Sequence, residues 1–306
     1  MTADTLHSAS TPSPFWGEAN LATPLDFIAL MKPGVMSLVV FTALVGALLA
    51  PGALHPGLMT IAIICIALGS GAAASFNMWY ERRTDALMAR TQSRPLPAGR
   101  MAPEDALTFA CLLSLFSVAF LGLATTWAAA AMLAFTIFFY AVVYTMILKP
   151  STPQNIVIGG AAGALPPVVG WLAVSPHFDP LPWTLFLMIF LWTPPHFWAL
   201  ALHRHEDYIR AGIPMLPAVA GKAACRNQII FYSVLTVGSS YLPLVFLPQL
   251  NGLYGVGATL LNTVFLVLAF AVKKPGRERD ALMLFFYSIL YLFGLFGLLT
   301  IAHWRS

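Results

Sequence analysis

The chain has 306 residues, of which 59% are hydrophobic and only 9% are charged. Soluble domains carry about 25% charged residues, so this composition excludes an ordinary soluble protein and indicates one embedded in a membrane. The net charge of +4 does not indicate nucleic-acid binding, because the basic residues cluster in loops between apolar segments.

The chain begins with a polar segment, residues 1 to about 24, that is rich in Ser, Thr and Pro. No apolar core follows a basic start, which excludes a cleaved secretory signal, and we expect a flexible cytoplasmic tail. Residues 25–306 are expected to form one transmembrane domain. They contain nine apolar stretches of about the 20 residues that a spanning helix needs: 26–49, 57–80, 105–125, 127–148, 156–174, 181–202, 228–247, 252–272 and 281–302.

These stretches are predicted to be helices, because backbone polar groups cannot stay unpaired in lipid. Long unbroken apolar runs exclude a β-barrel, whose strands are short and alternating. The fold class is therefore an all-α polytopic membrane protein with nine transmembrane helices in a bundle. The long charged loops follow the second and the sixth span, which suggests two four-helix halves plus a ninth helix.

Lys and Arg set the orientation of a membrane protein, because they concentrate in cytoplasmic loops. With the N-terminus in the cytoplasm, 15 of the 16 basic residues lie on the cytoplasmic side, and only Arg305 lies outside. The reverse orientation would place those 15 outside. We therefore expect a cytoplasmic N-terminus.

The loop after the second span carries the densest polar chemistry, in the sequence NMWYERRTDALMARTQSRPLPAGR from residue 77 to 100. Asn77, Glu81 and Asp85 are spaced by four, so they stack along one face of a helix. Three oxygen-bearing side chains in a row suit Mg²⁺, which takes one or two carboxylates, keeps waters and bridges to substrate phosphates. Nearby arginines can hold a diphosphate through charge-assisted hydrogen bonds: Arg82, Arg83, Arg90 and Arg94.

The alternative for this loop is a positively charged cytoplasmic segment whose acids merely pair with its arginines. The aligned row, together with Arg90-Thr91 and Arg94-Pro95-Leu96, favours the metal and diphosphate site. Metal and arginines together would stabilise diphosphate as a leaving group.

A second stretch, from residue 148 to 171, is rich in small residues. Gly159, Gly160 and Gly163 allow close helix approach or leave room for a bulky ligand. The proline pair at 166–167 is expected to kink or break the fifth span. Asn155 stands at the cytoplasmic end of that span, where it can cap the helix or contact the site.

A third stretch, WTPPHFWALALHRHEDYIRAGIPMLP, runs from residue 192 to 217. His196 lies inside an apolar span, where a histidine is either a hydrogen-bonded packing residue or a ligand. Arg204 and Asp207 follow at the cytoplasmic end and can form a second shell for diphosphate or metal. The alternative for this cluster is an interfacial group of charges without a ligand.

The chain resembles the haem O synthases, the haem-modifying branch of the UbiA-type intramembrane prenyltransferase superfamily. The resemblance covers nearly the whole chain after residue 25. It is carried by four segments: MKPGVMSLVVFTALVG, NMWYERRTDALMARTQSRPL, NIVIGGAAGALPPVVGW and WTPPHFWALALHRHEDYIRAGIPMLP.

In that superfamily the first acidic motif is a row of Asn and Asp spaced by four, which maps here to Asn77, Glu81 and Asp85. The resemblance implies that this row holds Mg²⁺ and diphosphate and that His196 lies on the haem side. It implies charge assistance from Lys32, Arg82, Arg90, Arg94 and Arg204.

The superfamily's second motif, an Asp-rich row after the sixth span, is depleted in this chain. The corresponding region offers His196, Arg204, Glu206 and Asp207. This departure separates the haem-modifying branch from the quinone-modifying branches, and it leaves the number of metal ions open.

The resemblance also implies an activity. Mg²⁺-assisted departure of diphosphate from farnesyl diphosphate gives an allylic cation, a vinyl group of haem b attacks it, and water adds. The products are haem O, with its hydroxyethylfarnesyl chain, and diphosphate. Further implied partners are membrane lipid and the haem A synthase or the terminal oxidase assembly, with no nucleic acid. The implied location is the cell inner membrane, with the active site facing the cytoplasm.

Three other functions remain as alternatives. A relative that prenylates a quinone precursor would keep the second Asp row, where this chain has Phe197, Trp198 and Leu200. A transporter would have broken helices with polar residues near the middle of the membrane, whereas here the polar groups crowd one face. A haem-carrying assembly factor would bind haem and release no diphosphate.

Overall fold

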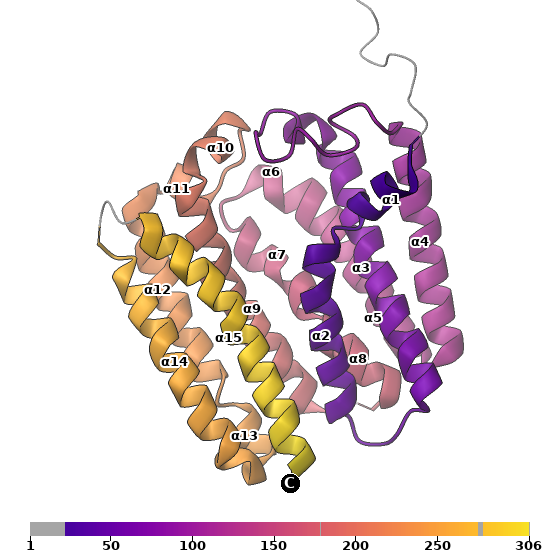
Figure 1. Ribbon diagram of the computed structural model, residues 1–306, viewed down its shortest axis with the longest axis vertical. Helices are drawn as coiled ribbons and strands as arrows, with labels where there is room; N and C mark the ends of the chain where they lie inside the picture. Colours follow the sequence, from indigo (N-terminus) through magenta and orange to yellow (C-terminus); the bar gives the residue numbers. More distant parts are fainter. Residues whose placement is uncertain (1–21, 178, 275–277, 306) are drawn as a thin grey trace, which may run out of the picture.

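The computed structural model describes residues 22–177, 179–274 and 278–305, and all of its regular elements are helices (Figure 1). Most of the expected tail, residues 1–21, lies outside the described residues. The membrane-length helices are α2 (Pro33–Leu49), α3 (Pro56–Asp85), α4 (Pro103–Ala124), α5 (Trp127–Phe138) with η1 (Phe139–Leu148) and α6 (Lys149–Ser151), α7 (Asn155–Ala164) with α8 (Pro166–Val174), α9 (Pro180–His203), α12 (Gly221–Ser239) with α13 (Pro243–Phe246), α14 (Leu253–Ala271) and α15 (Glu278–Arg305). The short elements are α1 (Pro24–Leu30), α10 (His205–Arg210), α11 (Leu216–Val219) and η2 (Pro248–Asn251).

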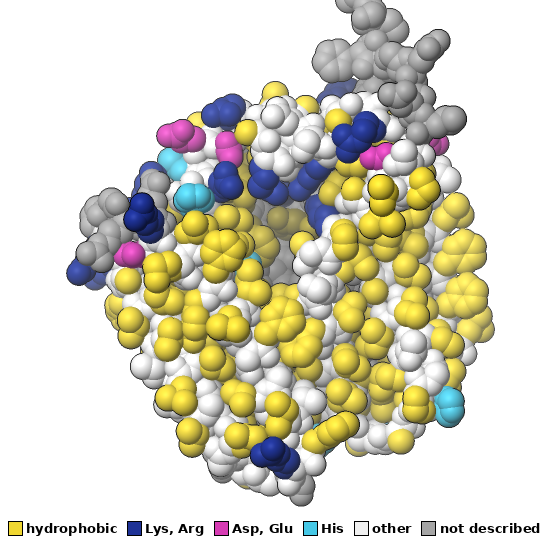
Figure 2. All heavy atoms as spheres, in the orientation of Figure 1, with side chains coloured by type: hydrophobic (Ala, Val, Ile, Leu, Met, Phe, Trp, Pro, Cys, Tyr) yellow, Lys and Arg dark blue, Asp and Glu magenta, His cyan; other side chains and the backbone are white. Residues whose placement is uncertain are grey.

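Within the described residues, eight helical segments are long and apolar enough to cross a membrane, and the bent pair α1 and α2 makes a ninth. This confirms the predicted polytopic all-α fold. The helices stand side by side, and the loop after α3, α10 and α11 gather at one end of the bundle (Figure 1). Figure 2 shows Lys and Arg side chains gathered at that same end, around a hollow in an otherwise mostly hydrophobic face.

Proline begins most of these helices. At the first helical position its missing N–H removes no helical hydrogen bond, and its fixed φ suits the first turn. The start of α5 has no proline, and there a side chain caps the helix: the Thr126 hydroxyl accepts from the Ala129 amide at 3.1 Å, with only two residues between α4 and α5. Prolines at or near the start are Pro24, Pro33, Pro56, Pro103, Pro166 and Pro180.

The prediction of one continuous helix from 26 to 49 was wrong. The span breaks between α1 and α2, which meet at an angle of 55°. Lys32 sits at the break with φ 53°, a left-handed conformation that is rare for residues with a side chain. The cause is Pro33, because a residue before proline is disfavoured in the α-helical region. The predicted break at residues 166–167 is confirmed, since α7 ends at Ala164 and α8 begins at Pro166.

The helix after α5 continues as a ten-residue π-helix, η1, which nothing in the sequence had indicated. The π-helix is rare and is found frequently at functional sites. Here the Thr145 hydroxyl donates to the carbonyl of Tyr140, five residues earlier, at 2.8 Å. The wider turn changes which side chains of this span face α3.

Two glycines let α2 and α8 cross with their backbones in contact. A Cβ atom on Gly46 would lie 2.0 Å from the carbonyl oxygen of Pro167, and one on Gly170 would lie 1.9 Å from that of Ala43. No side-chain rotation relieves such a clash, because the obstructing atoms belong to the backbone. Small residues at membrane-helix crossings serve this close approach.

We expect Gly170→Ala to destabilise the protein by about 3 kcal/mol, because the two helices must separate to admit the methyl group. Gly238→Ala is the matched control: nothing lies within 4 Å of its added Cβ, and its stability should be unchanged or slightly raised. Apparent unfolding temperatures of the purified proteins in detergent would check this. Equal unfolding temperatures for the two variants would contradict the crossing.

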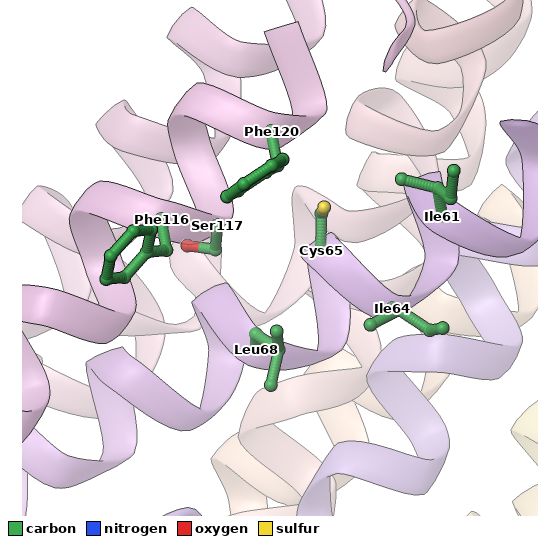
Figure 3. Close-up of a pocket in the computed structure, with 7 residues that line it drawn as sticks. All are labelled: Ile61, Ile64, Cys65, Leu68, Phe116, Ser117 and Phe120. Carbon is green, nitrogen blue, oxygen red and sulfur yellow. The ribbon is translucent and has the colours of Figure 1, made fainter. Parts of the chain in front are cut away.

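A shallow groove on the outer surface between α3 and α4 offers no charged group (Figure 3). Its one hydroxyl, on Ser117, already donates to the carbonyl of Ser114 at 3.0 Å. A phosphorylated substrate is therefore not expected there. The groove is lined by Ile61, Ile64, Cys65, Leu68, Phe116, Ser117 and Phe120.

Candidate active site

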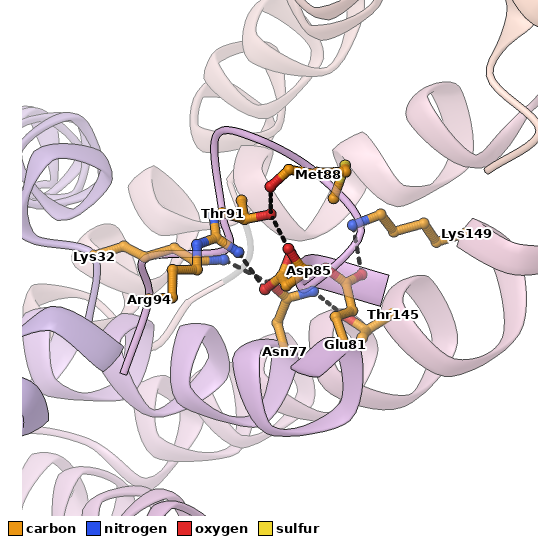
Figure 4. Close-up of polar contacts among 9 residues, drawn as sticks. All are labelled: Lys32, Asn77, Glu81, Asp85, Met88, Thr91, Arg94, Thr145 and Lys149. Atoms are coloured by element: carbon orange, nitrogen blue, oxygen red, sulfur yellow. Dashed lines mark hydrogen bonds and ion pairs between the residues drawn. The ribbon is translucent and has the colours of Figure 1, made fainter. Parts of the chain in front are cut away.

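The predicted row lies at the end of α3 that faces the charged loops. Asn77, Glu81 and Asp85 occupy successive turns and point to one side of the helix (Figure 4). All three are buried, with exposed fractions of 2%, 7% and 1%. Two carboxylates buried this deeply need compensating partners, because an unpaired charge is costly away from water.

The first position of the row is held from both sides. The Lys32 ammonium donates to Asn77 Oδ1 at 2.6 Å, and Asn77 Nδ2 donates to the Thr145 hydroxyl at 3.1 Å. An ammonium group can only donate, so the amide oxygen must face Lys32 and the amide nitrogen must face η1. The break before α2 and the π-helix therefore fix the orientation of Asn77 together.

The two carboxylates each contact a cation from a different segment. Lys149 Nζ, at the start of α6, lies 2.5 Å from Glu81 Oε1. Arg94 Nη1, from the loop after α3, donates to Asp85 Oδ2 at 2.6 Å. The Thr91 hydroxyl donates to the backbone carbonyl of Asp85 at 2.7 Å and anchors the same loop to the end of α3.

The carboxylates of the row have oxygens without a hydrogen bond. Glu81 Oε1 has only its ion pair with Lys149. Asp85 Oδ1 is buried and has no hydrogen-bond partner among the described residues. Buried polar atoms are nearly always satisfied, so an orphaned carboxylate oxygen beside a second carboxylate fits a site for a cation. The described residues form no cluster of three His, Cys, Asp or Glu. A metal held here would complete its coordination with water and phosphate oxygens, which is the habit of Mg²⁺.

The structure does not bring two of the predicted arginines to the row. Arg82 turns back along α3, where Nη1 donates to the Trp79 carbonyl at 2.7 Å and the guanidinium lies 5.5 Å from the Trp79 ring centre. Arg90 is exposed in the loop. Their assignment to the diphosphate stays a prediction.

Asn155 begins α7 and is fully buried. The predicted cap is not found, because the N-cap residue of α7 is Gln154 and no side chain caps this helix. Asn155 Nδ2 donates instead to the Thr152 carbonyl at 2.6 Å, and its Oδ1 has no partner among the described residues, so its contact with the site stays a prediction. At the end of α9, Arg204 is exposed, and Asp207 in α10 lies 3.9 Å from Arg210. In the described part of the chain, no hydrogen bond or ion pair joins Arg204 or Asp207 to the row, so their role beside the diphosphate or metal stays a prediction.

His196 lies inside α9 and is packed between aromatic rings. Its ring stacks on Trp192 at 4.3 Å and on Phe285 at 4.5 Å, and its Nδ1 lies 2.6 Å from the Ser288 hydroxyl on α15. It is therefore a hydrogen-bonded packing residue, one of the two predicted possibilities. Whether it also serves a ligand depends on its other ring nitrogen.

Two residues that hold the row were missed in the sequence: Thr145 and Lys149. Lys149 follows an apolar span and was indistinguishable from any lysine that marks the cytoplasmic side. Thr145 lies in an apolar run, and only the π-helix aims it at α3. Thr91 had been singled out with Arg90, and the structure shows that it anchors the loop to the end of α3.

Comparison with known proteins agrees with this architecture. The model of the UbiA prenyltransferase family matches residues 39–290. A Rhodopseudomonas palustris (strain BisB5) protein named Protoheme IX farnesyltransferase is 55% identical, over 94% of this chain and 92% of its own length. A Parvibaculum lavamentivorans protein of the same name is 51% identical, over 98% and 95%.

Solved structures share the fold. A UbiA homologue from Aeropyrum pernix K1, in its apo form, aligns with a TM-score of 0.70 at 16% identity, covering 89% of this chain and 98% of its own. A UbiA homologue from Archaeoglobus fulgidus, bound to DMAPP and Mg²⁺, aligns with a TM-score of 0.63 at 13% identity and the same coverage. With the matched family model and the full-length relatives, these findings establish that the chain belongs to the UbiA prenyltransferase family.

Proposed function

We propose that this chain transfers the farnesyl group of farnesyl diphosphate to haem b, forming haem O and releasing diphosphate. Prenyl transfer from a diphosphate is supported by the buried row of Asn77, Glu81 and Asp85, in which each residue contacts a Lys or Arg side chain. The choice of haem rather than a quinone precursor rests on the relatives named Protoheme IX farnesyltransferase, which match over almost the whole chain.

The chain's own residues prepare the site for a diphosphate. Lys32, Arg94 and Lys149 lie beside the row, where their charges are available to the phosphate oxygens of a bound substrate. Asn77, Glu81 and Asp85 are the residues that would hold Mg²⁺. When bound, Mg²⁺ supplies the Lewis acid that stabilises the departing diphosphate. The apolar helices around the site exclude water from the allylic cation until the haem vinyl group has reacted.

The orientation follows from the same cluster. The row lies in the last turns of α3, and the loop after α3 and α10 lie at the same end of the bundle (Figure 1), where Lys and Arg side chains gather (Figure 2). Since basic residues mark the cytoplasmic side, this end faces the cytoplasm of a bacterial inner membrane in our proposal. Water-soluble diphosphate then leaves on the side where the substrate arrives.

The direct test incubates the purified protein with farnesyl diphosphate and haem b, with and without Mg²⁺, and identifies the haem product by mass. Haem O and free diphosphate should form in equal amounts only in the complete mixture. A quinone precursor in place of haem b serves as the competing acceptor. Prenylation of that acceptor without haem O formation would overturn the proposal, and so would haem binding without diphosphate release.

We expect Lys149→Met to raise the KM for farnesyl diphosphate by about 10- to 100-fold, the value of one charge-assisted hydrogen bond of about 1.5–3 kcal/mol. Methionine keeps the length of the side chain and removes its charge. Lys273→Met removes an exposed lysine after α14 and should leave the KM unchanged. Steady-state kinetics at saturating haem would distinguish them, and equal effects of the two substitutions would exclude Lys149 from substrate binding.

A further inference from the structure

The hydrogen bonds around His196 determine which of its ring nitrogens carries the proton. The Ser288 hydroxyl donates its only hydrogen to the Phe285 carbonyl at 2.6 Å. The 2.6 Å contact between Ser288 Oγ and His196 Nδ1 must therefore be donated by Nδ1–H. In the neutral imidazole this places the lone pair on Nε2. This is the arrangement by which an outer hydrogen bond prepares a histidine as a metal ligand.

Nothing in the described part of the chain uses that lone pair. Nε2 has no hydrogen-bond partner among the described residues, and it is not among their fully enclosed, unpaired atoms, although the residue is only 7% exposed. Nε2 is thus an accessible acceptor in a largely apolar interior.

The packing leaves only one direction of approach. Trp192 and Phe285 cover the two faces of the imidazole, with interplanar angles of 18° and 23°. The Trp192 indole is itself fixed, because its Nε1 donates to the Ser288 carbonyl at 2.8 Å. Phe197 stands edge-on to the imidazole, with ring centres 5.1 Å apart and an interplanar angle of 86°. With both faces covered and Nδ1 bonded to Ser288, the remaining position for a ligand is Nε2, in the plane of the ring. An axial ligand of a porphyrin iron donates along that direction.

The depth of His196 matches that of the row. It lies seven residues before the end of α9, and Asn77 lies eight residues before the end of α3, so both are about 10–12 Å from the same end of the bundle (Figure 1). Helix α7 lies between them: Gly159 faces the Tyr144 ring of η1, and Gly160 faces the Thr193 methyl of α9. Thr193 is one turn from His196.

We propose that His196 Nε2 binds the iron of the porphyrin substrate as an axial ligand, and that Ser288 is the positioning residue that fixes its tautomer. This inference rests on the proposed function, because it names how that function's acceptor is held. Iron ligation fixes the porphyrin at one point, while the diphosphate is fixed separately at the row. The two substrates are thereby anchored at two separate points near the same end of the bundle.

The test uses the full chain in detergent with haem b and no farnesyl diphosphate, followed by absorption and electron paramagnetic resonance spectroscopy. The wild type should show an imidazole-ligated iron. His196→Ala should lose this signature, and added imidazole should restore it by occupying the space of the missing side chain. His55→Ala, at the opposite end of the bundle, is the control and should match the wild type.

Ser288→Ala should weaken haem affinity by about 10- to 100-fold, the usual cost of removing an outer-shell partner, whereas Ser288→Thr keeps the hydroxyl and should retain the affinity. A purely structural role for His196 predicts an unchanged iron spectrum in His196→Ala, and that result would overturn the inference. Binding of Mg²⁺ and farnesyl diphosphate to each variant shows that it has folded. Haem O formation by the wild type separates this inference from the proposed function. If the wild type forms haem O but His196→Ala has the same iron spectrum as the wild type, the proposed function stands and only the iron ligation by His196 is wrong.

Discussion

Asp85→Asn is expected to lower kcat/KM for farnesyl transfer by about 1,000-fold or more, which corresponds to about 4 kcal/mol. The substitution preserves the shape of the side chain, so the fold should survive. It removes the negative charge that pairs with Arg94 at 2.6 Å. It also replaces two carboxylate oxygens, both able to bind a cation, by one amide oxygen and an NH₂ group that can only donate hydrogen bonds. The orphaned Oδ1 makes this the position of the row with the most capacity for a metal.

Asp26→Asn is the matched control for that substitution. Asp26 is also buried, and it also pairs with an arginine of the loop after α3, since Arg100 Nε lies 3.0 Å from its Oδ1. It belongs to α1 and lies outside the row. We expect its loss to change kcat/KM by less than about tenfold, in line with one hydrogen-bonded ion pair.

Kinetics across a range of Mg²⁺ concentrations would separate a metal role from a structural one. Asp85→Asn should raise the Mg²⁺ concentration needed for half-maximal activity, and Asp26→Asn should not. If both variants lose activity equally without any change in Mg²⁺ dependence, Asp85 only anchors the loop, and the row is not the metal site.

Much of this fold could be predicted because hydropathy depends on local composition. Apolar runs of about 20 residues in lipid have one stable form, so the spans follow from the sequence. The break at Pro166 could also be predicted, because proline acts on its own helix. The break at Lys32 had the same kind of signal in Pro33, but the apolar pattern on both sides concealed it.

The site was predictable only where its residues share one helix. Asn77, Glu81 and Asp85 are aligned by helical spacing alone, so their common face was visible in the sequence. Lys149 and Thr145 reach them from another helix through a π-helical segment, and no local pattern specifies that meeting. His196 illustrates the same limit, because its tautomer depends on Ser288, which is 92 residues away along the chain.

The sequence departs from its superfamily's pattern at the centre of the row, and the structure offers a reason. Glu81 reaches Lys149 across the space between α3 and α6, and the longer side chain suits a partner on a neighbouring span. Each member of the row thus has a cationic partner from a different segment: the break before α2, the loop after α3, or the start of α6. A diphosphate bound at the row would contact all three segments, and this would couple substrate binding to their packing.

Lys32 provides the second large effect, and it separates activity from stability. Lys32→Met and Lys32→Gly both remove the ammonium that contacts Asn77 Oδ1, and we expect each to lower kcat/KM by about 100- to 1,000-fold, or about 3–4 kcal/mol. Lys32→Arg keeps a positive charge and should retain part of the activity.

The two inactive variants should differ in stability, because the backbone at Lys32 has φ 53°. Glycine adopts this conformation without strain, whereas methionine keeps a Cβ, so Lys32→Gly should be more stable than Lys32→Met by about 1 kcal/mol. Apparent unfolding temperatures in detergent, measured beside the kinetics, would show this order. Equal stabilities would mean that the break carries no strain, and full activity of Lys32→Met would mean that the break does not serve to deliver a charge to Asn77. If glycine relieves the backbone strain that methionine keeps, while both variants lose activity, then the strained conformation at this position is retained for the function of the lysine side chain.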